Sequence, residues 1–234
     1  MIPIILIAVN FVREQRWPLI AMLGYVVVFG GGIGMAADAD PGDVLFFLRS
    51  LGVYGLAFTA FLAASAIHNE RRSRRILAVL SKGIERGQYL AGLLAGTALA
   101  AAIYCAAIGV VGGWALARNG MPVTQLWAWL VITLAAFLLA GTVSLFFSTF
   151  LHPLVAVAAA AATLGVAGTL AQQAGPPWGA VMPAATLVES MLNFSYHGWR
   201  APWLPAAWAI ADALLFWILA TLIFGRRDIA VAIE

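Results

Sequence analysis

The chain has 234 residues, of which 63% are hydrophobic and only 10% carry a charge. Soluble domains are about 45–50% apolar and about 25% charged, so this chain has too few charges to coat a water-facing surface. The composition excludes a soluble enzyme and a disordered chain. It predicts a single all-α integral membrane domain over residues 1–234, and the net charge of +3 does not imply a nucleic-acid partner.

Apolar stretches long enough to cross a membrane recur along the sequence. A helix needs about 20 apolar residues for this. The predicted spans are 17–36, 45–67, 89–117, 124–149, 153–172 and 204–224. Asp43 is expected to cap the second span, because a short acidic side chain suits a helix start.

The basic residues predict the orientation. Lys and Arg collect on the cytoplasmic side of membranes. Ten of the 13 basic residues lie on one predicted side, at the N-terminus, between spans two and three, or after span six. The opposite side has only Arg49, Arg118 and Arg200. Both termini are therefore expected in the cytoplasm, as in a multi-pass protein of a bacterial inner membrane. Seven of the nine tryptophans then fall at the outer boundary, where they are expected to form an anchoring belt.

Two segments differ from the spans. Residues 1–16 begin with an apolar stretch that is too short to cross and is followed by charges, which predicts an elbow helix lying in the inner interface. Residues 175–201 are semi-apolar and rich in proline, and they predict a re-entrant or interfacial helical hairpin on the outer face, with residues 184–194 long enough for three turns.

The loop over 68–88 is the one long polar stretch and faces the predicted cytoplasm. Glu70 and Arg74 have the i,i+4 spacing of a helix pair, and Ile76, Leu77 and Leu80 form an apolar stripe. A short amphipathic helix here can lie on lipid or dock into a groove of a partner. The sequence has no phosphate-binding G-x-x-x-x-G-K-[ST] motif, so ATP-driven work has to come from another polypeptide.

The loop resembles the permease family of type-2 (type V) ABC exporters. In that family an acidic residue and a short helix of the form L-x-x-L-L precede P-[IV]-x-R-x-x-[YF]-L-x-G-K. The matching residues are Glu70, Ile76-Leu77-Ala78-Val79-Leu80-Ser81, Ile84, Arg86, Tyr89-Leu90 and Gly92. Gly83 stands in place of the proline and Leu93 in place of the lysine, and Arg74-Arg75 replaces a common Gly-Thr. The segment 10–17 is similar to the family's amphipathic elbow helix.

The resemblance implies that this loop is a coupling helix, seated in a cleft of a separate ATP-binding subunit. Two such subunits, with their ATP and Mg, would drive two copies of this chain, which itself would bind no cofactor and catalyse no reaction. The residues implied in partner binding are Glu70, Arg74, Ile76, Leu77, Leu80, Ser81, Ile84 and Arg86.

Small residues in spans one and five allow close helix packing. Gly30 with Gly34 and Ala161 with Gly165 have the small-x-x-x-small spacing. They can serve packing within one subunit, or, as the resemblance implies, a homodimer interface.

Two acidic residues are weak candidates for a substrate path. Asp212 lies near the middle of span six, where an ionisable group is costly, and Glu189 lies in the outer hairpin. Each also has an ordinary interpretation, as an interior hydrogen-bonded carboxyl or a solvated one. Asp38, Asp40 and Asp43 lack the rest of a calcium-loop pattern, so no metal site is predicted.

Three alternatives to an exporter were compared. An intramembrane protease is excluded, because all three histidines lie outside the spans. A vitamin-capturing importer component would not need the arginine-rich loop, and a cytochrome-biogenesis permease shares the architecture and stays open. The aromatic outer boundary and the nearly charge-free spans favour an amphipathic or lipid-like substrate.

Overall fold

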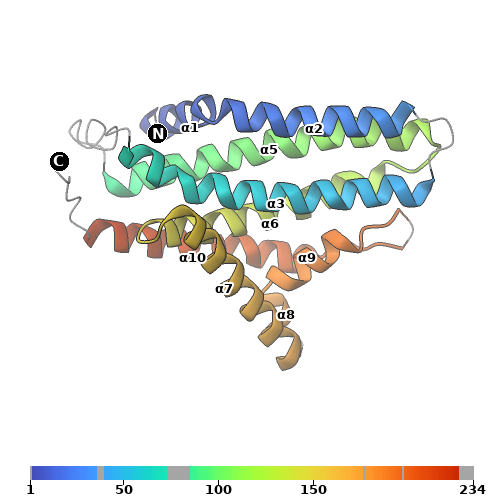
Figure 1. Cartoon of the computed structure of the whole chain (residues 1–234). Coiled ribbons are helices and arrows are strands. Elements are labelled where there is room, and N and C mark those ends of the chain that lie inside the picture. Colours follow the sequence, from blue (N-terminus) through green and yellow to red (C-terminus); the bar gives the residue numbers. More distant parts are fainter. Residues whose placement is uncertain (1, 36–39, 73–84, 176–177, 197, 227–234) are drawn as a thin grey trace.

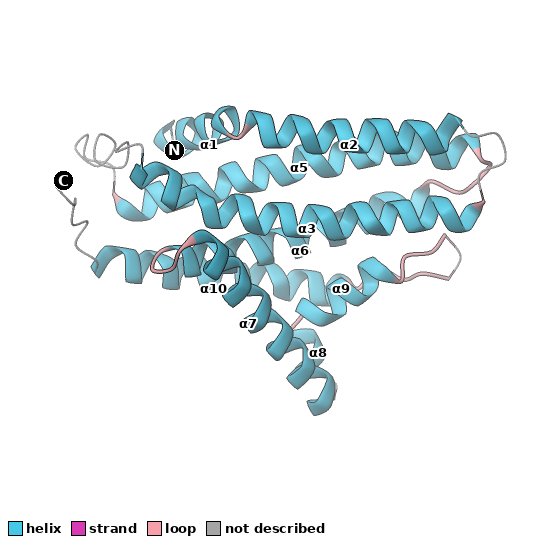
Figure 2. Ribbon diagram, in the orientation of Figure 1, coloured by secondary structure: helices cyan, strands magenta, loops and turns pink. Residues whose placement is uncertain are grey.

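The computed structural model describes residues 2–35, 40–72, 85–175, 178–196 and 198–226. Within these ranges every regular element is a helix (Figure 2). The helices are α1 (Ile2–Glu14), α2 (Arg16–Met35), α3 (Pro41–Arg72), α5 (Arg86–Arg118), α6 (Thr124–Ser148), α7 (Pro153–Ala174), α8 (Trp178–Val181), α9 (Ala184–Leu192) and α10 (Trp203–Arg226).

Six of these helices are long and apolar enough to cross a membrane, which confirms the predicted number of spans. They are α2, α3, α5, α6, α7 and α10. The end of the bundle where α2 begins at Arg16 and α5 begins at Arg86 is called the basic end. The opposite end, where α6 and α10 begin, is called the tryptophan end. The start of α1 and the end of α10 both lie at the basic end (Figure 1).

Helix α6 is the centre of the bundle. In its most apolar stretch 72% of the residues are buried, whereas the share is 22% in each of α2, α7 and α10. Its neighbours α3 and α5 are intermediate, with 61% and 44% buried. The three peripheral helices therefore present most of their apolar surface outward, as membrane helices facing lipid do.

The three central helices approach closely at one glycine. A Cβ on Gly55 of α3 would collide with the rings of Tyr104 on α5 and Phe137 on α6. The Tyr104 hydroxyl donates a hydrogen bond of 3.0 Å to the carbonyl of Leu51, also on α3. With no water in this layer, a buried phenol needs such a partner. The contact fixes the register of α3 against α5.

The start of α3 differs from the prediction. Asp43 was expected as its cap, but the helix begins earlier, at Pro41, and the Asp40 carboxylate accepts a hydrogen bond of 3.0 Å from the Gly42 N–H. Asp40 is thus the N-cap and Pro41 the first helical residue, where proline loses no hydrogen bond.

The structure does not show α1 as a helix lying across the bundle in a membrane surface. Helix α1 nearly continues the direction of α2 and lies along the first half of α5 (Figure 1). Helical hydrogen bonds bridge the junction at Gln15, since its N–H donates to Phe11 and its carbonyl accepts from Leu19. Gly92 and Gly96 of α5 leave room for the side chains of Ile7 and Phe11, so α5 offers α1 a packing surface.

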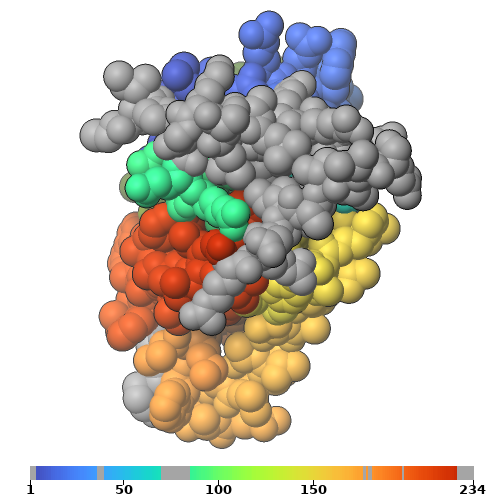
Figure 3. Space-filling view, turned by 90° about the vertical axis from the view of Figure 1, so that its left-hand side faces the viewer, coloured from blue at the N-terminus to red at the C-terminus, as the bar shows by residue number. Residues whose placement is uncertain are grey.

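Helix α7 diverges from the other spans. It starts beside α6 at the basic end and then runs obliquely away from the bundle (Figure 1). In the space-filling view from the basic end, the later part of α7 and the helices after it, coloured orange, lie below α10 (Figure 3). Its start is set by His152, whose extended backbone precedes Pro153 as proline requires. The segment predicted as a hairpin contains the two short helices α8 and α9; its re-entrant or interfacial position stays a prediction.

The glycines of α2 pack within the chain. A Cβ on Gly30 would collide with Val111 of α5, and one on Gly34 would collide with the ring of Trp114. Both glycines are buried. Packing within one subunit is therefore the use that the structure shows for this pair, and contact with a second copy stays a prediction.

Replacing Gly55 by leucine should lower the free energy of unfolding by about 1–3 kcal/mol or more, the usual cost of overpacking a core. The added side chain has to displace the rings of Tyr104 and Phe137. Thermal unfolding in detergent measures the change. Gly24→Leu is the matched control, because a Cβ at Gly24 meets nothing within 4 Å; equal melting temperatures for the two variants would contradict the contact.

Candidate functional site: two helix-end arginines and an apolar cavity

Most of the implied coupling residues lie outside the described residues. These are Arg74, Ile76, Leu77, Leu80, Ser81 and Ile84. The backbone of Glu70 belongs to α3, two residues before the end of that helix. The loop leaves the bundle where α3 ends and returns where α5 begins, so its two attachment points are both known.

Arg86, the last of the implied residues, holds the end of α10. Its Nη1 donates hydrogen bonds to the carbonyls of Phe224 at 3.2 Å and Gly225 at 2.8 Å. The last carbonyls of a helix have no partner within it, and a cation there also interacts favourably with the helix dipole. Arg86 thus ties the point where the loop re-enters the bundle to the end of the last span.

At the tryptophan end, side-chain donors bond carbonyls in the last turn of α9 and in the loop just after it. Arg49 of α3 donates to the Phe194 carbonyl through Nε at 3.1 Å and Nη2 at 2.7 Å. The amide nitrogen of Gln125, oriented to donate, reaches the carbonyls of Ser195 and Tyr196 at 2.7 and 2.9 Å. This set of contacts, with the two indole bonds described next, is called the α9 clasp.

Two tryptophans complete the α9 clasp. The indole N–H of Trp129 donates to the Met191 carbonyl at 3.2 Å, and that of Trp199 donates to the Ser190 carbonyl at 3.1 Å. The Phe194 ring packs against both indoles, with centroid distances of 5.1 and 5.4 Å. Trp129 is fully buried, so the prediction that it belongs to an exposed anchoring belt is wrong. Trp114, Trp127, Trp178, Trp203 and Trp208 are exposed, as such a belt requires.

The pKa of the Tyr196 phenol is shifted by burial and by the charges around the α9 clasp. Burial raises its pKa, and the Asp40 carboxylate adds to the rise while Arg49 opposes it. Tyr196 therefore stays a neutral hydrogen-bonding group. The cap of α3 and the loop after α9 share one electrostatic environment.

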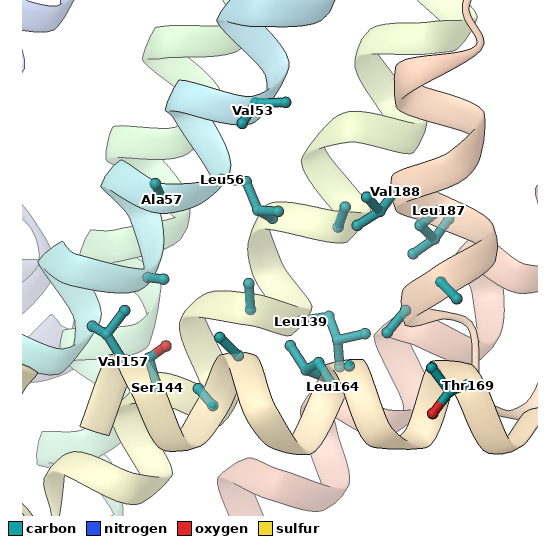
Figure 4. Close-up of a pocket in the computed structure, with 18 of the residues that line it drawn as sticks. Val53, Leu56, Ala57, Leu139, Ser144, Val157, Leu164, Thr169, Leu187 and Val188 are labelled. Atoms are coloured by element: carbon teal, nitrogen blue, oxygen red, sulfur yellow. The ribbon is translucent and has the colours of Figure 1, made fainter. Parts of the chain in front are cut away.

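An apolar cavity of about 490 Å³ lies between α3, α6, α7 and α9 (Figure 4). Most of its lining residues are small or aliphatic, and among them are Ala161 and Gly165 of α7 and Leu187 and Val188 of α9. None of the lining residues carries a charge; the polar ones are Ser144, Thr169 and Gln172. The volume of the cavity is that of an ordinary small-molecule site. Its apolar, uncharged lining suits a hydrocarbon ligand.

The divergence of α7 produces this cavity. Gly168 lets α7 meet α9 at Ala185, where a Cβ on the glycine would come within 2.6 Å of the alanine Cβ. Along the rest of this face, alanines and Gly165 are too short to fill the widening space, and a Cβ at Gly165 meets nothing within 4 Å.

The two acidic candidates do not line the cavity. Glu189 is exposed on α9 and Asp212 is half-buried on α10, and neither is among the lining residues. Ala161 and Gly165, proposed from their spacing as dimer contacts, line the cavity instead of packing within the chain. The sequence analysis missed the cavity because its lining residues carry no distinctive chemistry; the alanine-rich run of α7 was the available signal.

No cluster of three or more metal-ligating side chains occurs among the described residues. Two histidines, His68 and His152, lie together at the basic end, with ring centroids 5.2 Å apart.

No protein-family model matches the chain, and no curated protein matches it either.

Arg49→Met should lower the free energy of unfolding by about 1.5–3 kcal/mol, because the hydrogen bonds lost are charged and the Phe194 carbonyl is left without a donor. Thermal unfolding reports the loss, and amide exchange should rise over residues 190–196. The matched control is Arg118→Met, which removes an exposed arginine that lies over the Trp114 ring, 5.8 Å from its centroid. Equal effects of the two changes would contradict a role for Arg49 at the end of α9.

Proposed function

We propose that this chain is the membrane subunit of an ABC exporter and couples ATP binding and hydrolysis in a separate subunit to export of an amphipathic or lipid-like molecule. It would work as a homodimer with two ATP-binding subunits, in a bacterial inner membrane and with both termini in the cytoplasm. The observation that supports this proposal most is the way in which α3 and α5 are attached to the loop that resembles a coupling helix.

Helices α3 and α5 are longer than a membrane requires. They have 32 and 33 residues, or about 48–50 Å at 1.5 Å per residue, against a hydrocarbon core of about 30 Å. Their ends next to the loop are polar, with the exposed His68 and Asn69 on α3 and the partly buried Arg86 on α5. Two stiff helices thus extend the loop beyond the apolar layer, which a push from a soluble partner requires.

The ends of α3 and α5 next to the loop are packed into the bundle. At the basic end, Ile67 of α3 and Tyr89 and Leu90 of α5 are buried in one hydrophobic cluster that also includes Phe224 of α10. Arg86 adds its hydrogen bonds to the end of α10. Because these contacts join α3, α5 and α10 at the basic end, a displacement of the loop would move these three spans together.

The exposed faces of α2 and α7 suit a second copy of the chain. Val27 and Val28 on α2 and Val155 and Val166 on α7 are more than half exposed. Apolar faces of this kind contact either lipid or another helix. A homodimer through these two helices agrees with the resemblance stated above.

Leu77→Asp combined with Leu80→Asp should abolish copurification of an ATP-binding subunit when the chain is expressed with its neighbouring genes. Both leucines belong to the predicted apolar stripe, and a buried carboxylate in a partner's groove is costly. Affinity purification in mild detergent, followed by mass spectrometry, measures the association.

The matched control for this pair is Met35→Asp combined with Leu192→Asp. These residues are 71% and 43% exposed and lie at the tryptophan end, so the chemistry of the change is the same and the place differs. The control should keep the partner. A chain that purifies without any ATP-binding subunit would contradict the exporter and favour a stand-alone binding component.

Ser73→Cys should react with a membrane-impermeant maleimide only in inverted membrane vesicles, and Asn119→Cys should react in intact cells. This follows from placing the basic end in the cytoplasm. The native Cys105 is buried and gives a low background. The reverse labelling pattern would invert the proposed orientation.

A further inference from the structure

The apolar cavity between α3, α6, α7 and α9 holds one polar group whose hydrogen bond is missing. Ser144 is fully buried, lines the cavity (Figure 4), and its Oγ has no hydrogen-bond partner among the described residues. A buried hydroxyl without a partner costs free energy, and more so where no water can reach it. Such a group calls for a specific explanation.

Other hydroxyls of this chain show that the missing bond is not forced by the helix. A serine or threonine in a helix can donate to a carbonyl three or four residues earlier. Among the described residues nine do so, at 2.7–3.0 Å: Ser50, Ser65, Thr97, Thr142, Ser148, Thr149, Thr163, Thr169 and Thr221. The hydroxyls of Thr133 and Ser190 are buried without a partner among these residues, as that of Ser144 is, but they do not line the cavity. Thr142 and Ser148 belong to the same helix as Ser144. Ser144 is thus left free to donate into the cavity.

The shape of the cavity fits an extended chain. Its lining on α7 runs from Val157 to Gln172, which is about 22 Å at 1.5 Å per residue. One leaflet of the hydrocarbon core is about 15 Å thick, so the cavity is longer than one leaflet. It is also free of charged lining residues. A compact polar ligand would leave this surface unfilled, whereas a single hydrocarbon chain would cover it.

Ser144 lies where a lipid carries its ester group. It precedes the end of α6 by four residues, about 6 Å from the basic end of that helix. Ester carbonyls of a bilayer lie at the boundary of the hydrocarbon core, and a carbonyl oxygen is an acceptor for a serine hydroxyl.

We propose that this cavity binds one acyl chain of an ester-linked membrane lipid, whose ester carbonyl accepts a hydrogen bond from Ser144 and whose chain runs along α7 toward Thr169 and Gln172. Lipid entering from the leaflet at the basic end would be the substrate class of the exporter; this last step rests on the proposed function, whereas the binding is a property of this chain alone.

The experiment uses the purified full-length chain in detergent micelles with a phosphatidylglycerol that carries a diazirine on one acyl chain. After illumination, mass spectrometry should locate the label on α3, α6, α7 or α9 at cavity residues. Gly165→Phe should reduce this labelling at least tenfold, because the new ring fills the open space beside Gly165. Gly24→Phe, which faces outward on α2, should leave it unchanged.

The role of Ser144 is measured by competition with unlabelled lipid. The wild-type chain should bind the ester lipid about three- to tenfold better than its ether-linked analogue, as one hydrogen bond of ordinary strength gives. Ser144→Ala keeps the shape of the site and should remove this preference while leaving binding of the ether lipid unchanged. An equal preference in both proteins would overturn the assignment of the ester to Ser144.

Three other results would overturn the proposal. Label found only on the exposed faces of α2 and α10, or equal labelling of Gly165→Phe, would mean that the cavity takes no acyl chain. Efficient cross-linking of two Gly165→Cys chains by a short bis-maleimide would mean that a second copy occupies it. Copurification of an ATP-binding subunit tests the exporter separately, so loss of lipid binding with the partner retained would remove this inference and keep the proposed function.

Discussion

A carbonyl at or just after the end of a helix has no partner in that helix, so water or a side chain has to bond it. This chain meets that constraint with side chains from distant parts of the sequence. Arg49 holds the Phe194 carbonyl after α9, and Arg86 holds the last carbonyls of α10. Each arginine supplies several donors in a fixed plane, which a lysine does not. The arrangement of the helices depends on these two ends, because each joins elements more than a hundred residues apart.

The clasp on α9 also explains why a cavity persists beside it. Helix α9 is short, and alone it would not hold a position in the bundle. Trp129 of α6 bonds its Met191 carbonyl, Arg49 of α3 bonds the Phe194 carbonyl just after it, and its Ala185 packs against Gly168 of α7. These contacts hold α9 in place beside the cavity. The alanines that face this space cannot close it. A lipid chain there would restore the dispersion contacts that close packing ordinarily supplies.

Much of this fold follows from the sequence because span length is set by the membrane. The stretch 124–149 predicted α6 to within one residue, and the proline at 153 marked the start of α7. The exceptions have physical causes. The start of α3 moved to Pro41 because a local side-chain hydrogen bond at Asp40, invisible to hydropathy, decides the cap. Trp129 was assigned to the membrane boundary because composition does not say which way an indole faces. Helix α1 lies along α5 because Gly92 and Gly96 make room for it, a tertiary contact that no local pattern records.

The candidate site was the least predictable part, since its residues are ordinary and only their arrangement is unusual. Glu189 and Asp212 were singled out as charged residues, yet the cavity is lined mostly by alanine, leucine and valine, with Ser144, Thr169 and Gln172 as its polar residues. Its connection to the loop runs through α3. That helix ends at the loop, and its residues Val53, Leu56 and Ala60 line the cavity. Gly55, next to Leu56, is locked between Tyr104 and Phe137. In the proposed exporter, a push at the loop end of α3 would therefore tilt the helix about Gly55 rather than slide it, and the tilt would change the width of the space in front of α7.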